Sequence, residues 1–343
     1  MNTPRRIQTS SSWIRRILWL AAPPALFLAV LFRIADADAL WTTLVPAAPE
    51  WLLAAALLAV AFAVNQGALY QGVFAVLGED VKLGQAVSLS LVMAFGSLAL
   101  PGGTAAGIAY FVSAANGRGI GSSRALLASL AYYLFEYVAL LPVLLIGVAV
   151  LRLRHDLSPA SLAALAVFYG IALGAAGLMV WGFVRPEQAT RRLMVSAAWL
   201  RRTVRWMRRF LAAPAVARFA DEIQEILVLA RAGSARALRP LLHAALLQVI
   251  ALALLDAVFV ALGVRLPPPV LIAGYAVGTI FMLVSITPSG AGIVEGAMTV
   301  TFASLGVPLE TAASAAVLYR LYTCWLPLIA GFLTLRLMRP ARA

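Results

Sequence analysis

The chain has 343 residues, of which 63% are hydrophobic and only 12% are charged, and its net charge is +13. A soluble domain carries roughly 25% charged residues, so this composition excludes a water-soluble globular protein. Several apolar runs exceed the roughly 20 residues that a helix needs to cross a bilayer. The sequence therefore predicts an all-α polytopic membrane protein.

The basic residues are almost all arginine, and they flank the apolar runs. Such positions are typical of topology determinants and of contacts with anionic lipid headgroups. We expect membrane lipids as partners and no nucleic acid, because no nucleic-acid-binding motif accompanies the charge. Cys324 is the single cysteine, and the chain has no metal-ligand or cofactor motif. We therefore expect no metal, no cofactor and no enzymatic activity.

Continuous apolar segments predict about six transmembrane helices, at residues 17–32, 51–77, 124–151, 159–184, 240–262 and 310–335. Two further apolar stretches, 84–115 and 269–305, are each interrupted by proline and glycine. The two arms of the first stretch would be about 25 Å and 18 Å long, whereas the hydrocarbon core is about 30 Å thick. Because the shorter arm cannot cross, we expect two re-entrant hairpins buried among the other helices.

Arginine also orients these segments. If each interrupted stretch enters and leaves by the same face, the N-terminus, the arginine-rich segment 185–239 and the C-terminal tail share one side. The positive-inside rule makes that side cytoplasmic. Segment 185–239 is then a basic interfacial linker that contacts anionic headgroups, or alternatively a solvated charged linker. We expect a multi-pass protein of the bacterial inner membrane with both termini in the cytoplasm.

Matching residues recur at a constant offset of 187 positions. The pairs are Pro101 and Pro288, Gly103 and Gly290, Gly119 and Gly306, and Tyr132 and Tyr319. The offset predicts an internal repeat within a single integral membrane domain, 1–343, with a first unit at 51–151 and a second at 240–336. The second unit would be inverted relative to the first. Paired broken helices in such units mark the transport site of many transporters.

The candidate site follows from the two breaks. Glycine permits backbone conformations closed to larger residues, and amides exposed at the start of each second arm would favour a phosphate or carboxylate. The predicted substrate-binding residues are Pro101, Gly102, Gly103, Glu136, Pro288, Ser289, Gly290, Gly292, Glu295, Tyr319 and Arg320. The alternative is a pair of tight turns without a ligand.

Charged residues inside apolar segments include Glu136, Glu295 and Arg320. An isolated charge there costs several kcal/mol and is usually paired. Glu295 and Arg320 could neutralise each other as a structural ion pair. Alternatively, Arg320 could hold a lipid phosphate while Glu295 exchanges a proton. Glu136 occupies a similar place in the first unit, among aromatic residues.

The second half of the chain resembles the lysylphosphatidylglycerol synthase transmembrane-region family, also called the flippase-like domain family. The segments that resemble it are Thr287-Pro288-Ser289-Gly290-Ala291-Gly292-Ile293-Val294-Glu295-Gly296, Leu305-Gly306-Val307-Pro308, Leu318-Tyr319-Arg320 and Trp325-Leu326-Pro327. The resemblance implies a membrane module associated with moving lipids across the inner membrane. It also implies a stand-alone module here, without the soluble aminoacyl-transferase domain of the synthases.

These observations predict a lipid translocase or lipid-transport protein that moves an anionic, polyprenyl or glycolipid. No ATP-binding motif is present, so the protein would not be ATP-driven by itself. A secondary transporter of a small anion needs the same site. An accessory membrane subunit of a lipid-synthesis pathway and a membrane transferase are further alternatives. Lipid-synthesis enzymes and a second copy of the chain are the alternative protein partners.

Overall fold

The structure is a computed structural model that describes residues 45–100, 103–153, 184–203, 237–284 and 292–337, with isolated positions between these ranges. The predicted span 17–32 lies outside the described residues. So do the predicted span 159–184 and the linker beyond residue 203, apart from isolated positions.

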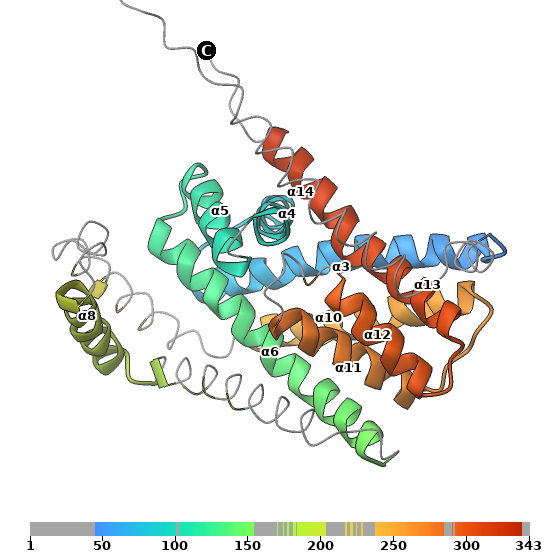
Figure 1. Cartoon of the computed structure of the whole chain (residues 1–343). Helices are drawn as coiled ribbons and strands as arrows, with labels where there is room; N and C mark the ends of the chain where they lie inside the picture. Colours follow the sequence, from blue (N-terminus) through green and yellow to red (C-terminus); the bar gives the residue numbers. More distant parts are fainter. Residues whose placement is uncertain are drawn as a thin grey trace, which may run out of the picture.

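Helices make up most of the described chain (Figure 1). They are α3 (Pro49–Val76), α4 (Leu83–Ala99), α5 (Thr104–Asn116), α6 (Ser122–Leu153), α8 (Pro186–Thr203), α10 (Leu238–Ala261), α11 (Pro268–Val284), α12 (Ile293–Ser304), α13 (Leu309–Arg320), the π-helix η4 (Leu321–Trp325) and α14 (Leu326–Leu337). Four stretches in this part are long and apolar enough to cross a membrane: α3, α6, α10 and the run Leu309–Leu337. The all-helical, membrane-spanning class is confirmed.

Helices α3 and α10 pack against each other in antiparallel directions. The amide of Ala48, at the start of α3, donates to the Ala261 carbonyl at the end of α10 over 2.8 Å. At the other end of the pair, Arg239 Nη2 donates to Gln71 Oε1 over 3.0 Å. Between them, Asn65 Nδ2 donates to the carbonyl oxygen of residue 243 over 2.8 Å. Backbone and polar side chains therefore fix the register of this central pair.

Each interrupted stretch forms two helices that pack on each other. A Cβ added at Gly107 of α5 would come within 1.9 Å of Ser97 Oγ on α4. In the second stretch, a Cβ at Gly274 of α11 would meet the ring of Phe302 on α12 at 2.1 Å. Small residues thus let the arms approach closely, as is common between membrane helices. At 1.5 Å per residue the second arms, α5 and α12, are only about 20 Å and 18 Å long.

The turns that end the second arms are equivalent. After α5 the chain turns through Gly119 at φ 83°, and after α12 through Gly306 at φ 92°. In the first turn the Ile120 amide donates to the Ala115 carbonyl over 3.1 Å, and the second turn repeats this bond from Val307 to Phe302 over 3.0 Å. A left-handed glycine with this bond is a Schellman-type helix end. The 187-residue offset therefore holds in backbone conformation.

The two halves exchange helices at equivalent places. Helix α6 of the first half crosses α11 of the second, where a Cβ at Gly147 would lie 2.5 Å from the Ala276 Cβ. Helix α14 of the second half crosses α4 of the first, where a Cβ at Gly331 would lie 2.2 Å from the Leu91 carbonyl oxygen. Figure 1 shows α14 passing beside α4 and α6 beside α11. The halves therefore form one intertwined bundle.

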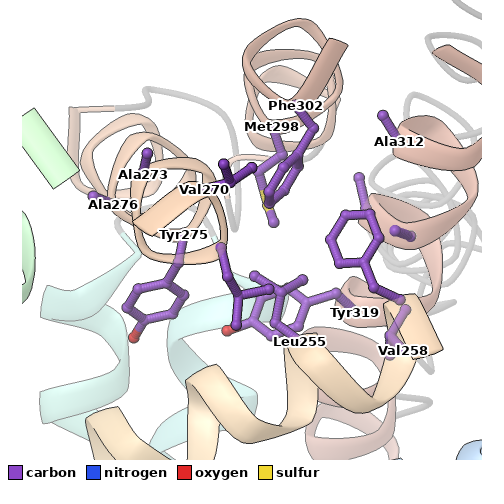
Figure 2. Close-up of a cluster of buried hydrophobic side chains, with 14 of the residues drawn as sticks. Leu255, Val258, Val270, Ala273, Tyr275, Ala276, Met298, Phe302, Ala312 and Tyr319 are labelled. Carbon is purple, nitrogen blue, oxygen red and sulfur yellow. The ribbon is translucent and has the colours of Figure 1, made fainter. Parts of the chain in front are cut away.

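Two apolar cores result. One gathers around the first hairpin and includes Tyr70, Phe74 and Phe111. The other gathers around the second hairpin, where Figure 2 shows side chains from α10, α11, α12 and α13 converging. In that view Tyr275 and Tyr319 reach into the same cluster, with ring centroids 6.5 Å apart. Each hairpin is thus held by its own core.

Candidate functional site

The described site residues lie at the starts of the second arms and on the helices that follow. Gly103 is the N-cap residue of α5 at φ 51°, and Gly292 is the N-cap residue of α12 at φ 82°. Gly290 also has a positive φ, of 67°. Only glycine adopts such conformations without strain, which explains why glycine stands at these positions. The other predicted break residues, Pro101, Gly102, Pro288 and Ser289, lie outside the described residues.

A buried ion pair lies at the start of α12, directly after the second break. Arg320 Nε on α13 donates to Glu295 Oε1 on α12 over 2.8 Å, and the side chains are only 4% and 6% exposed. The other carboxylate oxygen, Oε2, accepts a 2.6 Å hydrogen bond from the Gly292 amide. Glu295 therefore closes the first turn of α12 and neutralises Arg320 with the same carboxylate. The ion pair that the sequence left as one of two options is present.

The hydrogen-bonding pattern of the helix changes directly after Arg320. Residues Leu321–Trp325 form a π-helix, in which the Leu326 amide donates to the Leu321 carbonyl. Pro327 follows and cannot donate a backbone hydrogen bond to the turn before it. Single π-turns inside α-helices frequently occur at functional sites. The sequence predicted one continuous span here, and only Pro327 signals the interruption.

Glu136 lies in the middle of α6, on a different helix from the two members of this ion pair. Tyr132, one turn earlier, is within hydrogen-bonding reach of its carboxyl group. The Tyr132 hydroxyl in turn accepts a 2.8 Å hydrogen bond from Gln66 Nε2 on α3. Helix α6 also packs on α11 of the second half. The structure thus places Glu136 where helices of both halves meet, in an aromatic surrounding.

Polar side chains of α3 link this helix to its neighbours. Asn65 and Gln66 bond α10 and α6, respectively. Sequence reasoning missed Tyr275, whose hydroxyl donates to Gln248 Oε1 over 2.8 Å in a buried position. No repeat partner or local motif points to Tyr275. Only the fold shows that its ring meets the ring of Tyr319 and that α11, which carries it, packs on α6, which carries Glu136.

The arrangement at the second hairpin is suited to an anion. A buried guanidinium group and the N-terminal amide of a helix already share one carboxylate, and both kinds of group also bind phosphate. The first hairpin has no equivalent carboxylate, because Ile108 stands at the offset position of Glu295. The two breaks are therefore alike in backbone and different in charge.

Long apolar helices, two interrupted stretches that each form a pair of shorter helices, and a buried ion pair at one break characterise a multi-pass helical membrane protein. The family model described as "Lysylphosphatidylglycerol synthase TM region" matches residues 14–331. The chain belongs to this family, as the motifs at the second break indicated. None of the curated proteins compared with the chain matches it.

Proposed function

We propose that the protein moves an anionic lipid, or a polyprenyl or glycolipid, across the bacterial inner membrane, without using ATP by itself. The headgroup would pass between the two hairpins. Its phosphate would replace the Glu295 carboxylate on Arg320 and the Gly292 amide. The single observation behind the proposal is this buried ion pair at the start of α12, with membership of the family.

The packing of equivalent helices supports an inverted repeat around that path. Helices α3 and α10 correspond by the 187-residue offset, and they run antiparallel. Two units related by an axis in the membrane plane place their equivalent helices in opposite directions. The crossings of α6 on α11 and of α14 on α4 also correspond by the same offset. In this arrangement the hairpins would dip into the membrane from opposite faces.

Helix α8 supports contact with the cytoplasmic lipid surface. Arg191, Val195 and Arg202 lie on one exposed face of this helix, and Trp199 is 62% exposed. Arginine beside apolar and aromatic side chains is typical of helices that lie on an anionic membrane surface. We place α8 and both termini on the cytoplasmic side.

The test is fluorescent-lipid movement in proteoliposomes, measured with phosphatidylglycerol as the anionic probe. The variant is Glu295→Gln with Arg320→Gln, which removes both charges and leaves no buried lone charge. The amide oxygen of the glutamine introduced at position 295 can still accept the Gly292 hydrogen bond, so the turn is preserved. We expect the wild-type protein to move the probe between leaflets and the double variant to lose most of this activity.

The matched control is the other ion pair among the described residues, Arg124 with Glu79, whose side chains are 37% and 25% exposed. Glu79→Gln with Arg124→Gln should move lipid at the wild-type rate. Equal rates for wild type and the Glu295–Arg320 double variant would contradict the site. Uptake of a soluble anion without lipid movement would favour a small-anion transporter, and activity only with lipid-synthesis enzymes would favour an accessory subunit.

A further inference from the structure

We infer that Glu136 is a proton-binding site, separate from the anion site, through which lipid movement responds to a proton gradient. This inference rests on the proposed function for its transport role. The occupant is a proton taken up by the carboxylate to give the neutral acid and released again on the other side of the cycle. No other reactant is needed.

Glu136 lies near the middle of a membrane-spanning helix. Glu136 lies 14 residues after Ser122 and 17 residues before Leu153 in the membrane-spanning helix α6. At 1.5 Å per residue it is about 21 Å and 26 Å from the two ends. A carboxyl group at the centre of a span is costly to ionise, and such residues in transporters are commonly proton sites.

The neighbours of Glu136 are aromatic and do not include an ion-pair partner among the described residues. The ion pairs among the described residues are Arg124 with Glu79 and Arg320 with Glu295, so Glu136 has no cationic partner there. Its titratable neighbours on α6 are Tyr132, Tyr133 and Tyr137, and the Tyr132 ring stacks on Tyr70 of α3 at a centroid distance of 4.4 Å. Helix α11, which packs on α6, carries Tyr275. Without an ion pair to Glu136 in this part of the chain, the neutral acid is the form that costs least to hold here.

Packed side chains connect the helix that carries Glu136 to the proposed anion site. Glu136 lies on the face of α6 that also carries Gly147, eleven residues or about three turns further on, where α6 packs closely on Ala276 of α11. Tyr275 directly precedes Ala276, and its ring meets the ring of Tyr319 at a centroid distance of 6.5 Å and an interplanar angle of 89°. Tyr319 directly precedes Arg320 at the start of the π-turn. A change of charge at Glu136 therefore acts on the packing that positions the ion pair. Two packed rings link the two sites across the halves of the bundle.

The first measurement is the steady-state distribution of fluorescent phosphatidylglycerol in proteoliposomes with and without a pH gradient. If one proton moves per lipid, a gradient of one pH unit shifts the inner-to-outer ratio by about tenfold. We expect this shift in the wild-type protein and its loss in Glu136→Gln, which cannot exchange a proton. The Glu79→Gln, Arg124→Gln control should retain the shift. A gradient response in Glu136→Gln, or lipid movement in the wild type that ignores the gradient, would overturn the inference.

A second readout separates this inference from the proposed function. Infrared difference spectra between acidic and alkaline buffer report protonated carboxyl groups directly, without transport. We expect a carboxyl band that titrates in the wild type, is absent in Glu136→Gln and persists in the Glu295→Gln, Arg320→Gln variant. If wild-type protein moves no lipid but this band pattern is found, the proposed function fails and the proton site stands. A band that depends on Glu295 and not on Glu136 overturns the inference.

Discussion

At the scale of single residues, the Glu295–Arg320 pair is a stability element as well as a candidate site. Both side chains are buried, and the carboxylate is fully engaged by Arg320 Nε and the Gly292 amide. Removing one member leaves an uncompensated buried charge, which costs about 3–5 kcal/mol. Removing both charges avoids that cost. Charge balance, rather than the number of contacts, is therefore what stabilises this position.

The corresponding prediction concerns folding alone. Arg320→Ala should lower the midpoint of thermal unfolding in detergent strongly, because it leaves Glu295 unpaired in the bundle. Glu295→Gln with Arg320→Gln should lower it much less. The comparison is made by following helix content on heating. Equal midpoints for the single and the double variant would contradict a charge-balanced pair.

At the scale of elements, close packing of the arms determines the shape of each hairpin. Gly107 has no room for a side chain, since an added Cβ would lie 1.9 Å from Ser97 Oγ and 2.8 Å from the Met93 carbonyl oxygen. Gly107→Ala should therefore push α5 away from α4 and destabilise the protein by about 1–3 kcal/mol. Gly84→Ala, on the same hairpin but with nothing within 4 Å of its Cβ, should be neutral or slightly stabilising. Denaturant unfolding in mixed micelles compares the two, and equal losses would contradict the close approach.

The elements also show what the sequence could predict. Apolar runs located the long helices α3, α6 and α10 to within a few residues, because length and hydropathy are local properties. Proline and glycine located both breaks for the same reason. The π-turn at Leu321–Trp325 was missed, since it depends on how Arg320 and Pro327 are accommodated inside a helix of suitable hydropathy.

The sequence predicted those parts of the site that depend on residue type and local surroundings, and missed those that depend on contacts between helices. Glu295 and Arg320 were recognisable as buried charges that need a partner, and they are paired. The contacts of Tyr275 with Gln248 and with the ring of Tyr319 were not predictable, because they join residues of different helices. A repeat offset places equivalent residues but does not say which helices from opposite halves touch.

At the scale of the whole molecule, α3 and α10 run antiparallel, and the last helix of each half packs on the other half. Together these features lead to a specific prediction of membrane topology. If each hairpin is re-entrant, both ends of a hairpin lie on one side of the membrane. The first hairpin would then open to the cytoplasm and the second to the opposite face, since α3 and α10 run in opposite directions. A single broken span would instead place the two ends of each stretch on opposite sides.

Thiol labelling distinguishes these arrangements, and the chain is suited to it because Cys324 is its single cysteine and is buried. In a Cys324→Ala background, cysteines replace four exposed residues at the hairpin ends: Lys82 and Asn116 for the first, Arg265 and Glu310 for the second. A membrane-impermeant thiol reagent should modify the first pair only from the cytoplasmic side and the second pair only from the opposite side. Labelling of Lys82→Cys and Asn116→Cys from different sides would contradict the re-entrant hairpin, and labelling of all four positions from one side would contradict the inversion. The expected pattern requires that the ion pair at the start of α12 and the break before α5 approach the bilayer centre from opposite faces, so that a headgroup released by one hairpin can be received by the other.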